Sequence, residues 1–131
     1  PAAFVPEPGT LIDVGSGNGS PGLVLALVRD DLEVTLLEPR VRRWAFLREA
    51  SRASARRVNV LRQRHDGYSG PAARTVTLRA VALPLDELGS LVEPGGRVLV
   101  FGGRPRVSGP FAPTGEGEGL AGGVSVFRRL A

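Results

Sequence analysis

The sequence predicts a single α/β domain in which a mostly parallel, twisted β-sheet carries helices on both faces. Three features of the 131 residues lead to this expectation. Short apolar segments typical of buried strands alternate with helical segments, as in βαβ units. A glycine-rich turn joins the first of these strands to the first helix. Charged residues follow several strands at their carboxyl ends, where open parallel sheets bind ligands.

Composition narrows the class of protein. Hydrophobic residues make up 42% and charged residues 23%, which is ordinary for one globular domain. Cysteine is absent, so disulfides, thiolate metal sites and a cysteine nucleophile are excluded, and no metal site is predicted. No apolar run approaches the roughly 18 residues of a membrane span, and no signal peptide is visible. We expect a monomeric cytoplasmic protein without a membrane partner. Because the chain starts at Pro1 and not at Met, we expect a fold truncated at its N-terminus.

The basic residues are unusual in kind and in placement. All 17 are arginine, the formal net charge is +4, and nine of the 17 fall between Arg40 and Arg64. A concentrated positive field favours a polyanion such as RNA. A solvated helix face would give the same cluster without any partner, and the sequence leaves both explanations open.

The first strand and helix enclose the glycine-rich turn. A proline-rich lead-in, residues 1–9, is followed by a strand over Thr10 to Val14 and a helix from about Pro21 to Arg29. The turn between them holds glycine at positions 15, 17 and 19. Glycine permits positive φ and removes the Cβ atoms that would keep a ligand off the backbone, and the helix start offers free N–H groups. An ordinary turn needs fewer glycines, so this one predicts a site for a nucleotide-like ligand.

The next elements form a second βαβ unit. Glu33 to Leu37 is apolar and β-branched, which indicates a strand buried on both faces. Arg40 to about Ser54 has helical periodicity, with one apolar stripe and a basic edge made of Val41, Trp44, Ala45, Leu47 and Arg48. Trp44 and Phe46 are expected in the core, with base stacking as the alternative. Val58 to Leu61 is a third strand, and the polar loop from Arg62 to Gly70 leaves no room for a full helix.

The last third of the chain completes the sheet. We expect a fourth strand over Thr75 to Leu78 and a helix over Pro84 to Val92, with proline at its first turn. A turn at residues 93–96 leads to a fifth strand, Arg97 to Phe101. Residues 102–123 are rich in glycine and proline and predict a loop, and Val124 to Leu130 is a last strand.

Two ligand classes fit the glycine turn. Gly17-Asn-Gly19-Ser-Pro-Gly22 formally matches a dinucleotide fingerprint, which would indicate NAD. Asp13-x-Gly15-x-Gly17-x-Gly19 resembles motif I of class I S-adenosylmethionine methyltransferases, in which an acid closes the strand. A carboxylate suits an ammonium and a sulfonium but repels a pyrophosphate. The pattern therefore favours S-adenosylmethionine as cofactor.

Further segments carry a resemblance that spans about Leu11 to Gly103. They are Asp13-Val-Gly-Ser-Gly-Asn-Gly-Ser-Pro-Gly22, Val34-Thr-Leu-Leu-Glu38, Arg42-Arg43-Trp44-Ala45-Phe46-Leu47, Val58-Asn-Val60 with Arg64 and Asp66, Arg79-Ala80-Val81-Ala82, and Pro94-Gly-Gly96 before Val98-Leu-Val-Phe-Gly102-Gly103. Together these resemble the RsmG (GidB) family of small-subunit ribosomal RNA guanine-N7 methyltransferases. The resemblance implies a Rossmann-like class I methyltransferase fold, S-adenosylmethionine as cofactor, and ribosomal RNA or the small ribosomal subunit as partner.

The resemblance also implies roles for individual residues. Glu38 would accept hydrogen bonds from the ribose hydroxyls, Asp13 would face the ligand's ammonium, and Arg79 would approach the methyl donor or the RNA as a positioning residue. Asp13 could instead cap the loop, Glu38 could serve the following helix, and Arg79 could pair with an acid such as Asp13. The whole cofactor set is Asp13, Gly15, Ser16, Gly17, Gly19, Glu38, Pro39, His65, Asp66 and Arg79, and the RNA set is Arg42, Arg43 and Arg48. His65 and Asp66 would border the adenine. We expect His65 to be a surface or loop residue and not a catalytic base.

Three departures from the family pattern keep other functions open. Ser20 stands where the family usually has an aromatic residue, and Gly102-Gly103 stands where it usually has Lys-Gly. Because only nine residues precede the first predicted strand, we expect the helical N-terminal extension of the family to be missing. A non-catalytic relic that binds S-adenosylmethionine or RNA is the alternative these departures favour. An NAD-dependent oxidoreductase is the third possibility.

Overall fold

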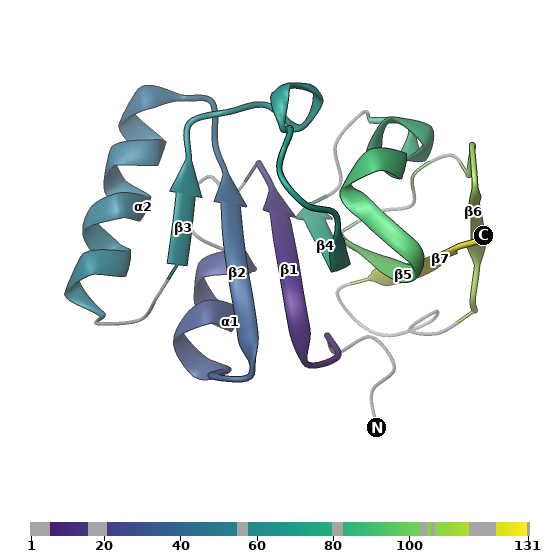
Figure 1. Cartoon of the computed structure of the whole chain (residues 1–131), viewed down its shortest axis with the longest axis horizontal. Coiled ribbons are helices and arrows are strands. Elements are labelled where there is room, and N and C mark those ends of the chain that lie inside the picture. The colour runs from purple at the N-terminus through teal and green to yellow at the C-terminus, as the bar shows by residue number, and fades with distance from the viewer. Residues whose placement is uncertain are drawn as a thin grey trace.

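The computed structural model of the chain describes residues 6–15, 21–54, 58–79, 83–102, 105, 107–115 and 123–130. These residues form one seven-stranded sheet in the order β3-β2-β1-β4-β5-β7-β6 (Figure 1). The strands are β1 (Gly9–Val14), β2 (Leu32–Leu37), β3 (Val58–Leu61), β4 (Ala73–Arg79), β5 (Val92–Phe101), β6 (Phe111–Pro113) and β7 (Val124–Arg129). β1 to β5 pair in parallel, and β7 is antiparallel to both β5 and β6. The expected α/β class with a mostly parallel sheet is confirmed.

Helices cover both faces of the sheet, as expected. On one face, α1 (Gly22–Val28) and α2 (Val41–Ala53) bury Leu23 and Leu47 against a layer of strand residues that includes Leu11, Val34 and Leu36. On the other face, the 3₁₀ helix η2 (Leu85–Leu91) packs against strand residues from β1, β4 and β5. Figure 1 shows α1 behind the sheet and η2 in front of it. A second 3₁₀ turn, η1 (His65–Gly67), lies between β3 and β4.

The helix predicted over Pro84 to Val92 is a 3₁₀ helix and not an α-helix. Its buried residues are Leu85, Leu88 and Leu91, each at most 1% exposed. A spacing of three places side chains on one line of a 3₁₀ helix, which has three residues per turn. The three-residue spacing of these leucines therefore indicates a 3₁₀ helix, which the sequence analysis did not recognise.

Two predicted boundaries in the last third of the chain are also wrong. The turn expected at residues 93–96 is a bulge inside β5, because Ala73 pairs with Val92 while Thr75 pairs with Arg97. Gly96 fits there because a Cβ would lie 2.7 Å from the carbonyl oxygen of Arg74. The loop predicted over 102–123 contains strand β6, whose Phe111 is 4% exposed and joins the core beside η2.

α2 buries a narrower stripe than the sequence predicts. Leu47 and Ser51 are its buried residues, while Val41 and Ala45 of the expected apolar stripe are exposed. Phe46, expected in the core, is 53% exposed. α2 packs beside β3, the edge strand (Figure 1), so only one side of the helix has a partner. No helix among the described residues is long and apolar enough to cross a membrane.

Candidate functional site

The order of the strands reverses at β1. β1 pairs with β2 on one side and with β4 on the other, all three in parallel, so the chain leaves β1 and β4 in opposite directions along the sheet. Crevices at such a switch point, beyond the carboxyl ends of the strands, are where open α/β sheets bind ligands. Asp13, Glu38, Asp66 and Arg79 all lie at this carboxyl edge, within or just after β1, β2, β3 and β4.

Asp13 is a buried carboxylate next to the glycine turn. It is 1% exposed, and its Oδ1 accepts a hydrogen bond of 2.6 Å from the hydroxyl of Thr77 on β4. Gly22 begins α1 directly over this side chain, where a Cβ would lie 2.4 Å from Oδ2. Gly22 is therefore required by packing, a role that the sequence analysis did not assign to it.

The glycine turn begins in the left-handed region. Gly15 has a φ of +66°, and a Cβ there would meet nothing within 4 Å, so its φ and not its surroundings favours glycine. Its N–H donates to the carbonyl of Leu37 at 2.9 Å, which fixes the turn to the end of β2. Ser16, Gly17 and Gly19 lie outside the described residues.

Glu38 is a second buried carboxylate at this edge. It directly follows β2 and is 2% exposed. Its N–H donates to Leu61 of β3 at 3.0 Å, and its Oε2 accepts from the N–H of Arg40 at 2.9 Å. The carboxylate thus satisfies a backbone group at the start of α2, where negative charge is favourable. Pro39, which follows it, is exposed.

The structure corrects the expectation for His65. It is not a surface side chain: it is 7% exposed, and its Nε2 lies 2.9 Å from Oε1 of Glu87 on η2. The ring of His65 therefore points to η2 and away from solvent. In the same η1 turn, the side chain of Asp66 is exposed, and it pairs with Arg64 at 3.3 Å.

Arg79 ends β4 and is exposed. It lies two residues beyond Thr77, so both side chains leave the same face of the sheet, the face that carries α1 and Asp13. The RNA candidates Arg42, Arg43 and Arg48 are also exposed, all on α2. Arg48 stacks on the ring of Trp44, with Cζ 4.8 Å from the ring centroid.

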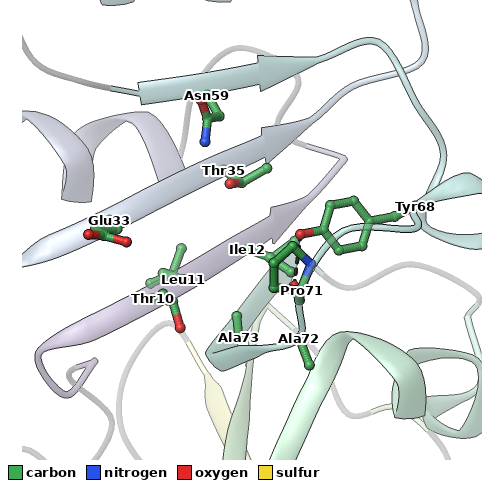
Figure 2. Close-up of a pocket in the computed structure, with 10 residues that line it drawn as sticks. All are labelled: Thr10, Leu11, Ile12, Glu33, Thr35, Asn59, Tyr68, Pro71, Ala72 and Ala73. Carbon is green, nitrogen blue, oxygen red and sulfur yellow. Dashed lines mark hydrogen bonds between the residues drawn. The ribbon is translucent and has the colours of Figure 1, made fainter.

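A cleft of about 170 Å³ lies elsewhere on the sheet (Figure 2). It lies on the face of the sheet that carries η2, between strands β1, β2 and β3 and the segment from Tyr68 to Ala73. Its lining is Thr10, Leu11, Ile12, Glu33, Thr35, Asn59, Tyr68, Pro71, Ala72 and Ala73. None of the predicted site residues lines it, and it is smaller than the several hundred Å³ of a typical cofactor pocket. Burial raises the pKa of the Tyr68 hydroxyl, which donates to the carbonyl of Pro71 at 2.8 Å.

Solved structures of methyltransferases share this fold. A coclaurine N-methyltransferase bound to N-methylheliamine and SAH aligns with a TM-score of 0.66 at 17% identity, over 76% of this chain and 32% of that one. A 16S rRNA methyltransferase from Thermus thermophilus, in complex with AdoMet and guanosine, aligns with a TM-score of 0.65 at 18% identity, over 94% of this chain and 38% of that one. At these identities the likeness establishes a Rossmann-like class I methyltransferase fold.

Proteins related by sequence are more similar to this chain than these solved structures are. Proteins named ribosomal RNA small subunit methyltransferase G from Streptomyces avermitilis and from a Nocardioides species are each 47% identical, over 106 and 108 residues. The matches cover 76% and 78% of this chain but 44% and 43% of those proteins, so the chain spans less than half the length of these curated relatives. The family model described as rRNA small subunit methyltransferase G, GidB, matches residues 2–106. The chain therefore belongs to the rRNA small subunit methyltransferase G family.

Proposed function

We propose that the chain is an S-adenosylmethionine-dependent methyltransferase core that transfers a methyl group to guanine N7 of small-subunit ribosomal RNA. The observation that carries the proposal is the pair of buried carboxylates, Asp13 and Glu38, on either side of the Gly15 turn at the strand switch point. Membership of the family supplies the substrate class. Because its substrate would be ribosomal RNA, we expect the protein to act in the cytoplasm, and to act as a monomer.

The chemistry of the site fits this cofactor. S-adenosylmethionine supplies an electrophilic methyl group on a sulfonium, together with a ribose diol and a cationic amino group. Glu38 would accept hydrogen bonds from the diol, since a carboxylate accepts two at once. Asp13 would attract the amino group, and Gly15 with the following glycines would leave the backbone open to the ligand. Asp66 and the backbone at His65 would border the adenine, with Pro39 beside it.

The remaining residues would orient the RNA. Guanine N7 carries a free lone pair at neutral pH, so methyl transfer requires no general base, and the rate would come from alignment and from exclusion of water. Arg79 would act as a positioning residue toward the methyl donor or the RNA. Arg42, Arg43 and Arg48, exposed on α2, would neutralise phosphates. Methyl transfer to N7 would therefore not need His65 as a base.

A non-catalytic member that binds cofactor or RNA is the second candidate. Gly102, where the family has lysine, has a φ of +87° and its N–H donates to the carbonyl of Gly123 at 2.8 Å. Because glycine has no side chain, position 102 supplies no positive charge to the substrate. Methyl transfer from labelled S-adenosylmethionine to 30S subunits and to naked ribosomal RNA separates the candidates, because the second binds without turnover.

Calorimetric titration with S-adenosylhomocysteine, with NAD as control, tests the cofactor. We expect micromolar binding of the first and none of the second; binding of NAD alone would instead support an oxidoreductase. Glu38→Ala should weaken S-adenosylhomocysteine binding by about 1–3 kcal/mol. Because Glu38 also accepts from Arg40, Glu38→Gln, which keeps an acceptor oxygen and the side-chain volume, is the matched variant. Unchanged affinity in both would remove Glu38 from the site.

A further inference from the structure

Phe46 is an aromatic side chain without a partner in the core. It is 53% exposed on α2, while Leu47 beside it is fully buried. The other aromatic residue of the helix is used differently: the Nε1 of Trp44 donates to the carbonyl of Val60 on β3 at 3.3 Å, and Arg48 covers one face of its ring. Trp44 thus protects the edge strand, which leaves Phe46 as the ring of α2 that is available to a partner.

Two arginines lie one helical turn before Phe46 on the surface of the helix. Arg42 precedes it by four residues and Arg43 by three, the two spacings that bring side chains together on one side of an α-helix. Both are exposed, and within the part of the chain that the structure describes neither forms an ion pair with a carboxylate. The one acid of α2, Glu49, pairs instead with Arg52 at 3.3 Å.

This surface lies next to the carboxyl edge of the sheet. α2 starts at Val41, three residues after Glu38, and runs away from that edge (Figure 1). At 1.5 Å per residue, Phe46 lies roughly 7.5 Å along the helix from Val41. A nucleic acid strand that reaches the edge of the sheet could therefore contact Arg42, Arg43 and Phe46 along the way.

We propose that Phe46 is a stacking platform for one unpaired base of the RNA, and that Arg42 and Arg43 hold the phosphates on either side of that base. An exposed aromatic ring with cations one helical turn away is a combination that binds single-stranded RNA, in which unpaired bases can leave the helix and stack. A second copy of the chain is disfavoured as occupant, because a symmetric contact through this surface would bring the arginines of both copies together. The inference rests on the RNA substrate of the proposed function and identifies how the RNA is held.

The test compares RNA affinities of variants of the whole chain. The probes are a short unpaired oligoribonucleotide and a duplex of equal length without unpaired bases, titrated over a range of salt concentrations. Phe46→Ala should lower affinity for the unpaired probe about tenfold, the loss of one base–aromatic stack, and leave the duplex nearly unaffected. Phe46→Tyr should restore binding, and Phe46→Leu, which keeps apolar surface without a ring, should not. Val28→Ala, at a site that is 68% exposed on α1, is the control for loss of an exposed apolar side chain.

Salt dependence separates the ring from the arginines. Phe46→Ala should leave the slope of log affinity against log salt unchanged, whereas Arg42→Ala or Arg43→Ala should reduce it by about 0.7 each. Wild-type affinity retained in Phe46→Ala, or equal losses for both probes, would overturn the inference while the proposed function stands on its cofactor binding. A change of oligomeric state in Phe46→Ala without any change in RNA affinity would also overturn it and assign the ring to a second copy. No RNA binding by the wild type would overturn the inference together with the RNA part of the proposed function.

Discussion

The hydroxyl of Thr77 donates a 2.6 Å hydrogen bond to Oδ1 of Asp13, and both residues are at most 1% exposed. They are register partners on β1 and β4, so the bond crosses the strand switch point itself. A buried carboxylate is stable only when its oxygens are satisfied. Thr77 therefore fixes the orientation of the carboxylate that would face the cofactor.

Thr77→Val should destabilise the chain by about 1–3 kcal/mol, because it leaves a buried charge with one donor fewer. Urea denaturation measures this loss. Thr75→Val is the matched control: Thr75 lies on the same strand and its buried hydroxyl has no hydrogen-bond partner among the described residues, so valine should be neutral or stabilising. Equal losses in the two variants would show that the bond to Asp13 contributes nothing.

Three glycines should respond differently to alanine. In Gly22→Ala the new Cβ would lie 2.4 Å from Oδ2 of Asp13, and overpacking of this kind costs about 1–3 kcal/mol. Because it displaces the Asp13 carboxylate, this variant should also weaken binding of S-adenosylhomocysteine. Gly15→Ala has open space but a φ of +66°, which costs about 1–2 kcal/mol. Gly67→Ala has neither constraint and serves as the neutral control. Thermal unfolding of the three variants would contradict this ranking if Gly67→Ala were the most harmful.

The elements that the sequence predicts best are those whose signal is local. The run from Val58 to Leu61 holds two valines and a leucine and forms β3 with those same bounds. The position of Glu38 after β2 follows from the strand itself. η2 was predicted as a helix, but its 3₁₀ form was missed although its leucines repeat every three residues, and β6 was missed because a single phenylalanine marks it within a segment of glycine and proline. β6 depends on its pairing with β7, which no window of sequence contains.

The candidate site divides in the same way. The edge position of Asp13 and Arg79 could be predicted, since Asp13 is the last residue but one of its strand and Arg79 is the last of its own. The burial of His65 could not, because its partner Glu87 is 22 residues away on η2. The exposure of Phe46 was also missed, because the helical pattern of α2 does not show that its neighbour, β3, is an edge strand with only one side to cover.

Glu7 anchors the lead-in segment to the end of the sheet at which the parallel strands begin, opposite the candidate site. Its Oε1 lies 3.3 Å from Nε of Arg74 and 3.4 Å from Nε of Arg97, whose side chain is 7% exposed. Glu7→Gln removes the negative charge beside a buried guanidinium and should cost about 1–3 kcal/mol in urea denaturation. Glu49→Gln, in an exposed pair with Arg52, should cost less than about 0.5 kcal/mol. Because the Glu7 side chain is itself 40% exposed, high salt should screen part of its effect. Equal losses in the two variants would show that the burial of Arg97 adds nothing to the pair.

Asp31 gives a pH dependence with a defined sign. The hydrogen bonds from Arg29, at 2.7 and 2.9 Å, hold the pKa of the Asp31 carboxyl below its ordinary value. Because this pKa is lower in the folded state, the stabilisation is present above the unfolded pKa, near 4, and is lost as the pH falls through the folded value. Arg29 also donates to the carbonyl of Pro6 at 3.0 Å, so the pair helps to hold the lead-in.

Asp31→Asn should therefore be less stable than wild type at neutral pH, and the difference should shrink as the pH falls below about 4. Urea midpoints of the two proteins from pH 7 down to pH 3 measure it, with Asp30→Asn as the neighbouring control; a difference that stays constant over this range would show that the charge of Asp31 does not stabilise the fold.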